Sequence, residues 1–519
     1  MSADERRHRG LTGTVVRGVS FAGGGYLLSR IITLVTYVIL ARLVTPAELG
    51  QFTSGSILVG IGLLLAGGGM VAALIHREEQ LEEAASTATL ATILAGMLAA
   101  LAGLAASPLI GSFFDSDTVA AVAAVSSGVL FLQSARAVPN ALLQRRFSFL
   151  RRLIVEPAAA VAFGIGAIIA TSSGMGVWGL VVGQYASATV DLVLSWGLVR
   201  WRPRVRLISF SMWRDLVSYG RHVLAGSAAR RLGDRVPIAV AGGMLGTSAV
   251  GQLQYANRIV TTPYSLLVAG ISYVIFPAFA RIAEDRERFK PAFLRSLRWA
   301  TLVAVPIGLI LAPLGEPLAI VAFGERWRLA GEVTAAICLF IPAQTIAAVT
   351  GEGFKGTGVP AKRTRVNVIA VLTGAAAMLV LTPIFGLFGV GLGISIDALT
   401  GAVLAIALAT GTMEIPLRSI LGVIAAPAAA GLLMVAVLFP VENLIVHAAD
   451  HGTALGLVLL CAEALLGLAI YLFGLRLLSP GLGHELRAML RTARRKPSDR
   501  DLEGDEELLE EEGEEMLPG

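Results

Sequence analysis

The feature that most constrains this 519-residue chain is a succession of fourteen long apolar segments, joined by short loops. A membrane-spanning helix needs about 20 mostly apolar residues. Each segment meets that length, so we predict an all-α polytopic membrane protein with about fourteen transmembrane helices. The predicted spans cover 18–41, 50–75, 87–110, 118–141, 153–171, 177–199, 217–241, 248–276, 299–322, 332–354, 366–385, 389–411, 419–440 and 453–475.

Composition excludes several other classes of protein. Hydrophobic residues make up 55% of the chain and charged residues only 15%, against roughly 25% charged in a soluble protein. A soluble globular enzyme, a disordered protein and a nucleic-acid binder are therefore excluded. Two cysteines, both within apolar segments, indicate no disulfide framework.

The placement of positive charge predicts the orientation of the chain. Of 42 lysines and arginines, 32 lie in the predicted inside segments, and only Arg42, Arg326 and Arg328 lie in outside loops. Positive charge accumulates on the cytoplasmic side of membrane proteins. We therefore predict a plasma-membrane (inner-membrane) protein with both termini in the cytoplasm. The N-terminal arm is 1–17, and the tail, 476–519, is basic, then acidic, and largely disordered.

An internal repeat divides the predicted spans into two sets of six. A shift of 201 residues aligns 41–59 with 242–260, places Gly50 on Gly251 and places Arg30 on Arg231. A second echo relates GVWG at 176–179 to GLFG at 386–389. The repeat predicts an N-terminal six-helix lobe (18–199), a basic cytoplasmic linker (200–216), a C-terminal six-helix lobe (217–411) and an extra helix pair (419–475). Two such halves around a central site are typical of transporters.

Four short motifs occur in an order that resembles the polysaccharide transporter family. They are LARLVTPAELG at 40–50, PNALLQRRF at 139–147, GVWGL at 176–180 and FGERW at 323–327. This family belongs to the same superfamily as multidrug and toxin extruders and lipid II flippases. The resemblance covers roughly residues 15–475. It implies export of undecaprenyl-pyrophosphate-type lipid-linked oligosaccharides, as in Wzx-type flippases for lipopolysaccharide O-units.

Charged residues within the predicted spans are the candidate site. A charge at mid-bilayer is costly and marks a functional hypothesis. Arginine suits phosphate oxygens, so we expect an anion site for a pyrophosphate-linked sugar. The candidate substrate-binding residues are Arg30, Arg136, Arg230, Arg231, Arg235 and Arg258. The alternative is that these arginines form ion pairs between helices, with Asp191, Asp397 or Glu463 as partners.

Asp234, Asp397 and Asp191 are candidates for coupling or charge pairing. No cofactor or metal site is expected, while coupling to H⁺, Na⁺ or the membrane potential stays open. No Walker motif or catalytic constellation is present, so we expect a non-enzyme. The expected partners are the lipid bilayer, the lipid-linked oligosaccharide and other polysaccharide-assembly membrane proteins, but no nucleic acid. The alternatives are a multidrug or cation antiporter, a membrane polysaccharide polymerase or ligase, and a scaffold without transport.

Overall fold

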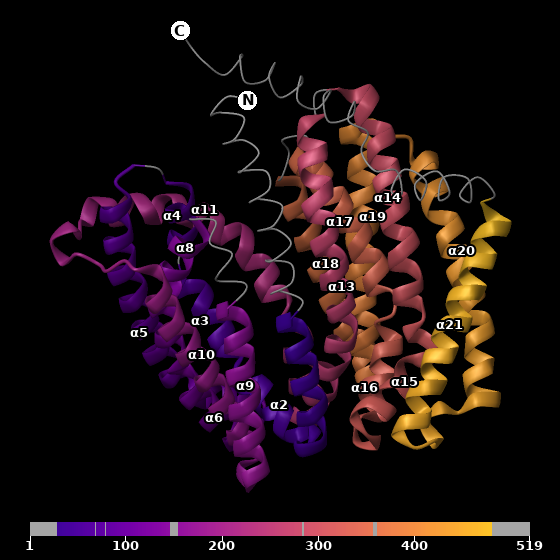
Figure 1. Ribbon diagram of the computed structural model, residues 1–519, viewed down its shortest axis with the longest axis horizontal. Coiled ribbons are helices and arrows are strands. Elements are labelled where there is room, and N and C mark those ends of the chain that lie inside the picture. Colours follow the sequence, from indigo (N-terminus) through magenta and orange to yellow (C-terminus); the bar gives the residue numbers. More distant parts are fainter. Residues whose placement is uncertain are drawn as a thin grey trace, which may run out of the picture.

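The computed structural model describes residues 28–67, 69–77, 79–145, 154–282, 285–356 and 361–479. Every regular element within these ranges is a helix, which confirms the predicted all-α polytopic class. Figure 1 shows two groups of helices side by side, with the last two helices at the margin of the second group. The predicted N-terminal arm, 1–17, and the tail beyond 479 lie outside the described residues.

The first group, here called the N-terminal lobe, begins with a helix at 28–43. It continues through α2 (Pro46–Gly55), α3 (Ile57–Gly67), α4 (Met70–His76), α5 (Leu81–Phe113), α6 (Asp117–Ser127), α7 (Val129–Ala135), α8 (Ala137–Arg145), α9 (Glu156–Ala170) and α10 (Val177–Val199).

The second group, the C-terminal lobe, follows a connecting helix, α11 (Phe210–Gly233). Its helices are α12 (Val236–Leu245), α13 (Thr247–Arg281), α14 (Arg286–Leu309), α15 (Leu311–Phe323), α16 (Arg328–Ala336), α17 (Phe340–Gly356), α18 (Ala361–Phe385) and α19 (Leu387–Met413). The last helix pair is α20 (Leu417–Val441) and α21 (Thr453–Leu478).

Nine helices in the described ranges are long and apolar enough to cross a membrane, or ten when a pair bent by 46° counts as one span. The count of fourteen therefore stays a prediction. Predicted span 177–199 coincides with α10, whereas 50–75 is divided among α2, α3 and α4. Span 217–241 is interrupted at Asp234–Arg235, between α11 and α12.

Proline explains the interruption between α11 and α12, and it also explains one contact of the last helix pair. Pro237 has no N–H to donate to the carbonyl of Gly233, four residues earlier, and α11 ends at that residue. Pro306 likewise leaves the carbonyl of Leu302 without its helical donor. The hydroxyl of Tyr471 in α21 donates to that carbonyl at 3.0 Å, so a proline in α14 creates the hydrogen bond that docks the last helix.

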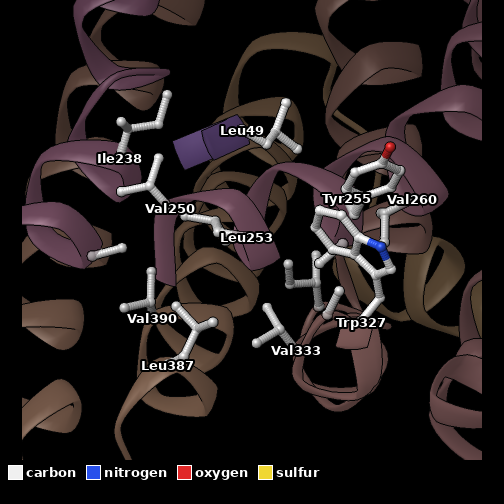
Figure 2. Packing of buried hydrophobic residues seen from close by; sticks show 14 of the residues in the cluster. Leu49, Ile238, Val250, Leu253, Tyr255, Val260, Trp327, Val333, Leu387 and Val390 are labelled. Atoms are coloured by element: carbon white, nitrogen blue, oxygen red, sulfur yellow. The ribbon is translucent and has the colours of Figure 1, made fainter. Parts of the chain in front are cut away.

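The largest hydrophobic cluster lies where the two lobes meet. Leu49 on α2 contributes to it from the N-terminal lobe, and Val250, Val333 and Val390 contribute from three helices of the C-terminal lobe. Figure 2 shows these side chains packed around the start of α13. The two lobes therefore share one buried core at this level, toward the lower end in Figure 1.

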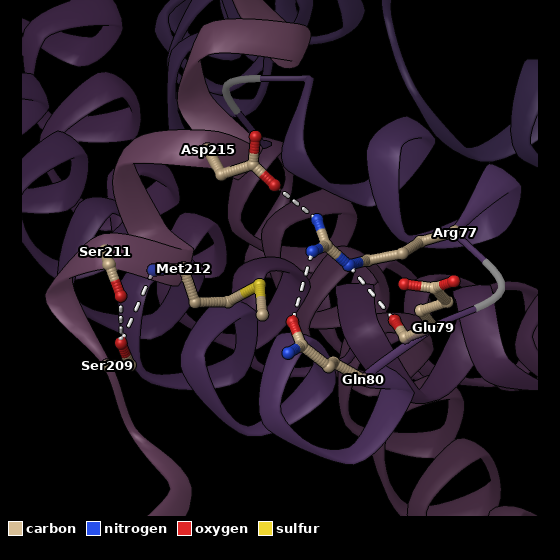
Figure 3. A network of polar contacts seen from close by, with 7 residues as sticks. All are labelled: Arg77, Glu79, Gln80, Ser209, Ser211, Met212 and Asp215. Atoms are coloured by element: carbon tan, nitrogen blue, oxygen red, sulfur yellow. Dashed lines mark hydrogen bonds and ion pairs between the residues drawn. The ribbon is translucent and has the colours of Figure 1, made fainter.

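At the opposite end, α11 connects the lobes. The Arg77 guanidinium, after α4, forms an ion pair with Asp215 on α11, donates to the carbonyl of Glu79 at 3.1 Å and donates to Gln80 Oε1 at 3.5 Å (Figure 3). Leu216 is buried in the N-terminal lobe's cluster, whereas a side chain at Gly233 would meet Val371 of α18. The start of α11 therefore packs on one lobe and its end on the other.

Candidate functional site

The lobes cross at two glycines that the 201-residue repeat relates. A Cβ atom at Gly50 in α2 would lie 1.6 Å from the carbonyl oxygen of Thr247, and one at Gly251 in α13 would lie 1.9 Å from that of Pro46. Thr247 is itself the repeat equivalent of Pro46. The contact is therefore reciprocal, as at a two-fold interface between identical subunits. Glycine is required here because the two backbones touch.

A second set of contacts joins the lobes beside this crossing. The indole of Trp327 donates to the carbonyl of Ala41 at 2.9 Å, and Arg326 donates to that of Val44 at 3.3 Å. In the reverse direction, Arg42 donates to the carbonyl of Val321 at 3.2 Å. The carbonyls of Ala41 and Val44 lie at the end of the helix at 28–43, where helical donors have run out. The FGERW segment at 323–327 thus closes this end of the junction.

Arg258 lies deeper in the junction. Its guanidinium carbon is 3.4 Å from the ring centre of Tyr37, on the helix at 28–43, in a cation–π contact between the lobes. The Tyr37 ring also packs edge-on against Tyr255 and stacks with Phe163. An aromatic face binds the cation without neutralising it, because the ring carries no net charge.

Arg235 lies at the break between α11 and α12 and reaches the N-terminal lobe. A Cβ atom at Gly60, in α3, would lie 2.3 Å from a guanidinium nitrogen of Arg235. Any larger residue at position 60 would therefore displace the guanidinium. Gly60 was not predicted as a site residue, because a glycine within an apolar segment gives no signal of its own.

The two arginines that the repeat relates, Arg30 and Arg231, are both exposed on helices of the junction. Arg30 lies near the start of the described part of the first helix, and Arg231 lies in the last turn of α11. From their equivalence under the repeat we predict that the two face each other across a central cavity, and this stays a prediction. Arg230 precedes Arg231 in α11, but its side chain lies outside what the structure describes.

Arg136 lies elsewhere and takes part in a network within the N-terminal lobe. It follows α7 and forms an ion pair with Asp191 on α10. Asp191 also accepts a hydrogen bond from Ser195 at 3.0 Å and one from Asn140 at 3.4 Å. The structure thus gives Arg136 the ion-pair partner that was weighed as the alternative to substrate binding.

The remaining acidic candidates lie in the C-terminal lobe. Asp397 on α19 packs against Gly374 of α18. A Cβ atom added at Gly374 would lie 2.5 Å from the Cβ of Asp397. Its Oδ1 is buried without a hydrogen-bond partner among the described residues. Asp234 is exposed at the helix break, and its negative charge acts on Asp397. Glu463 lies in α21, in the last helix pair.

At the junction, two arginine side chains therefore contact uncharged groups of the opposite lobe. Arg235 lies on a glycine backbone and Arg258 on an aromatic ring. Guanidinium groups held in this way keep donors available for the oxygens of an anion. Within the described part of the chain, no group of three or more His, Cys, Asp or Glu residues could hold a metal ion.

Comparison with solved structures shows which fold this is. The lipid II flippase MurJ, in an inward closed conformation, superposes with a TM-score of 0.73 at 15% identity, covering 89% of this chain and 99% of that one. An inward-facing multidrug resistance transporter of the MATE family superposes with a TM-score of 0.59 at 16% identity, covering 77% and 98%. The chain therefore shares the polytopic helical fold of these two structures.

Curated relatives share sequence with more than half of the chain. The succinoglycan biosynthesis transport protein ExoT of Rhizobium meliloti is 26% identical over 309 residues, 59% of this chain and 62% of that protein. The teichuronic acid biosynthesis protein TuaB of Bacillus subtilis is 22% identical over 61% of this chain and 66% of its own length. The chain thus spans less than two thirds of the length of each of these relatives.

A family model described as "Polysaccharide biosynthesis protein" matches residues 39–331. The matched segment begins within the first helix and ends in α16, so it includes the glycine crossing, the FGERW segment, Arg235 and Arg258. It covers more than half of the 519 residues. The chain belongs to this polysaccharide biosynthesis protein family.

Proposed function

We propose that this protein is a flippase that moves lipid-linked oligosaccharide repeat units from the inner to the outer leaflet of the plasma membrane, for cell-surface polysaccharide biosynthesis. The observation that carries the proposal is the set of arginines at the lobe junction, in a chain of this family. Arg235 and Arg258 both reach from the C-terminal lobe to the N-terminal lobe without a carboxylate between them.

The substrate chemistry follows from these groups. An undecaprenyl-pyrophosphate-type carrier presents phosphate oxygens, which guanidinium groups bind through paired, charge-assisted hydrogen bonds. We add Arg30, on the helix at 28–43 that carries Tyr37, and Arg231, in the last turn of α11 before Arg235. The transported unit needs no bond broken, so we propose transport without catalysis. The excess of positive charge in the predicted inside segments favours cytoplasmic termini.

Alternating access gives the lobes their roles. The glycine crossing and the FGERW contacts close the junction at one end. Opening that end requires the lobes to separate there while the arginines keep hold of the phosphates. Asp234 and Asp397 are the proposed groups for coupling to H⁺ or Na⁺, because Asp234 directly precedes Arg235, the charge of Asp234 reaches Asp397, and neither belongs to the ion pair of Arg136.

Substitution of Arg30 and Arg231 tests the proposal. Each Arg→Ala change should cost about 1.5–3 kcal/mol of substrate binding, which is roughly tenfold or more. The double variant should abolish surface polysaccharide in a strain that lacks the native gene. Arg→Lys should restore export only in part, because an ammonium lacks the planar fork. Arg418→Ala, at the start of α20, is the matched control and should export normally.

Membrane protein level, measured in parallel, separates binding from folding. Wild-type export by the Arg30→Ala, Arg231→Ala double variant would overturn the proposed site. Export that falls only in proportion to protein level would assign these arginines a structural role. A multidrug antiporter, the alternative of the same fold, would instead leave polysaccharide unchanged and alter resistance to cationic drugs.

A further inference from the structure

The last helix pair brings two glutamates to the same level. A Cβ at Gly474 of α21 would lie 3.2 Å from the Cβ of Ala430 in α20, and one at Gly467 would lie 2.6 Å from a methyl group of Leu438. The helices are antiparallel, so one turn further Glu463 in α21 meets Glu442, which directly follows α20. The packing of the two helices therefore places the Glu463 side chain close to that of Glu442.

Both glutamates are removed from solvent. Glu463 is 3% exposed and Glu442 is 5% exposed. Glu442 accepts hydrogen bonds from the backbone N–H of Ala448, at 3.0 and 3.3 Å to its two oxygens. Neither oxygen of Glu463 has a hydrogen-bond donor among the described residues. The polar group that Glu463 faces is therefore another acid.

Two ionised carboxylates cannot stably face each other in such a place. Burial penalises each charge, and the like charges repel strongly where little water screens them. One proton removes one of the two charges and with it the repulsion, and the protonated carboxyl then donates a hydrogen bond to the carboxylate that remains. We propose that Glu442 and Glu463 form a proton-binding site that holds one proton between them.

A metal cation fits poorly between Glu442 and Glu463. The backbone N–H of Ala448 donates to the Glu442 oxygens, so a hydrogen-bond donor already occupies that side of the carboxylate. Sodium and divalent ions need more oxygen ligands than two side chains supply. In the described ranges, no third acid joins the pair to make a possible metal cluster.

The proton can reach the pair from one side. Glu442 also lines a cavity of about 350 Å³ between α15, α16, α20 and the 442–450 segment. Glu442 therefore lies between this cavity and Glu463. The other charged or titratable groups that line the cavity are Glu316 on α15, Arg328 and Glu332 on α16, and His447 and Asp450 beyond α20.

Among the residues that the structure describes, no ion pair reaches either glutamate from the remaining sides. Arg328 is engaged by Glu316 and Glu325 in ion pairs. From α14, the side chains packed on the last pair are apolar, with Leu302, Val305 and Leu309 in one cluster. On α21 itself, the hydroxyl of Tyr471 donates to the Leu302 carbonyl. The single negative charge that remains on the pair is therefore stabilised by the shared proton and by the Ala448 N–H.

Infrared spectroscopy of the purified full-length protein in lipid nanodiscs tests the proposal. Wild type at neutral pH should show the carbonyl stretch of a buried protonated carboxyl that exchanges slowly in D₂O. Glu463→Gln and Glu442→Gln should each remove one such band per molecule. Asp450→Asn, in the same cavity wall, is the control and should leave the band unchanged. A carbonyl spectrum that loses no intensity in either glutamine variant would overturn the proposal.

Two further measurements guard against other outcomes. If replacing sodium by N-methylglucamine creates a band that is absent in sodium buffer, a metal cation holds the site and the proposal fails. In thermal unfolding, alkaline pH should destabilise wild type more than Glu463→Gln, because wild type then has two facing carboxylates. Equal pH dependence of the two proteins would contradict a shared proton. Neither readout depends on export, so failure here is distinct from failure of the proposed function.

Discussion

The two lobes use the same backbone devices but handle charge in opposite ways. The α9–α10 and α18–α19 hairpins turn at Gly176 and Gly386, with φ of 53° and 58° and ψ of −126° and −137°. In the N-terminal lobe, Arg136 is paired with Asp191 inside its own lobe. In the C-terminal lobe, Arg235 and Arg258 reach across to the other lobe.

The difference indicates what the repeat preserves. Backbone conformation and close helix contacts recur because they decide whether each half folds. Arg42 crosses from the N-terminal lobe at the closed end of the junction, whereas Arg235 and Arg258 come from the C-terminal lobe and meet a neutral surface of glycine and tyrosine. An anion that binds between the lobes would therefore be held mainly by one of them, leaving the other able to move.

The largest effect should come from the shared crossing. Gly50→Ala places a methyl group 1.6 Å from a backbone carbonyl oxygen, and no side-chain rotation can relieve that clash. The helices must separate, so the loss of stability should exceed about 4 kcal/mol, a range reached only by severe defects. Thermal unfolding in detergent measures it.

Gly67→Ala, in α3, is the matched control, because no atom lies within 4 Å of the added Cβ. It should leave the unfolding temperature unchanged or slightly raised. Since the contact is reciprocal, Gly251→Ala should be as damaging as Gly50→Ala. A mild effect at one glycine and a severe one at the other would break the symmetry of the comparison.

The second prediction concerns the ion pair inside the N-terminal lobe. Arg136→Ala leaves Asp191, whose side chain is only 15% exposed, without its counter-ion. Loss of one partner of a buried pair costs about 3 kcal/mol. Arg136→Met with Asp191→Leu should recover most of that stability, because no charge is then stranded.

Export separates this ion pair from the junction arginines. If Arg136 is structural, the Arg136→Met, Asp191→Leu double variant should export in proportion to its membrane level. A stable double variant that exports nothing would assign the pair to substrate or coupling, as first considered from the sequence. Junction variants such as Arg231→Ala should show the reverse, with normal levels and lost export.

Sequence predicted the features that follow from composition and repetition. The helical class, the extent of α10 and the equivalence of Gly50 and Gly251 under the 201-residue shift depend on runs of apolar residues and on repeated residues at fixed spacing. The interruption at Asp234–Arg235 was not predicted, although Pro237 could have signalled it. The sequence predicts one continuous helix over 217–241. In the structure Arg231 lies in α11 and Arg235 lies in the break after it, so the two do not lie on one face of a single helix.

The arginines' neighbours could not be predicted in the same way. Contacts such as Arg235 with Gly60 and Arg258 with Tyr37 join residues far apart in the chain. They depend on how two lobes pack, which a single sequence does not encode locally. Asp191 was named as one of three partners for the arginines, and only the packing of α7 on α10 selects Arg136 for it.

A smaller effect is expected at the two hairpin glycines. Their backbone angles are strained for any other residue, so alanine should cost about 1–3 kcal/mol at each. Gly386→Ala tests strain alone, because no atom lies within 4 Å of the added Cβ, whereas at Gly176 the Glu48 carboxylate lies 2.5 Å away. Gly176→Ala should therefore lower the unfolding temperature by as much as Gly386→Ala, or by more.

The helical glycine Gly422 in α20 serves as the control. Its added Cβ also meets nothing within 4 Å, and α20 is helical at this position. Gly422→Ala should be neutral or stabilising, since alanine favours the helix by about 0.5–1 kcal/mol. If Gly386→Ala behaves like Gly422→Ala, the turn of the α18–α19 hairpin does not require glycine. The glycine that the two hairpins share would then not be needed for their structure.

The smallest effect should be at an exposed ion pair in the C-terminal lobe, between Arg286 and Glu414. The hydrogen bond from Arg286 lowers the pKa of Glu414 below its usual value. An acid whose pKa is lowered by folding stabilises the protein above its unfolded pKa, and that contribution disappears as pH falls through the lowered value. The side chains are 62% and 57% exposed, so water and salt screen the pair.

Arg286→Gln should therefore change the unfolding temperature far less than Arg136→Ala does at neutral pH. The small difference from wild type should vanish in acid, once Glu414 is protonated, and also at high salt. Arg136→Ala should keep its effect at high salt, because Asp191 is shielded from solvent ions. Equal effects of the two substitutions would mean that burial does not distinguish these ion pairs, and the contrast between paired and unpaired arginines would lose its physical basis.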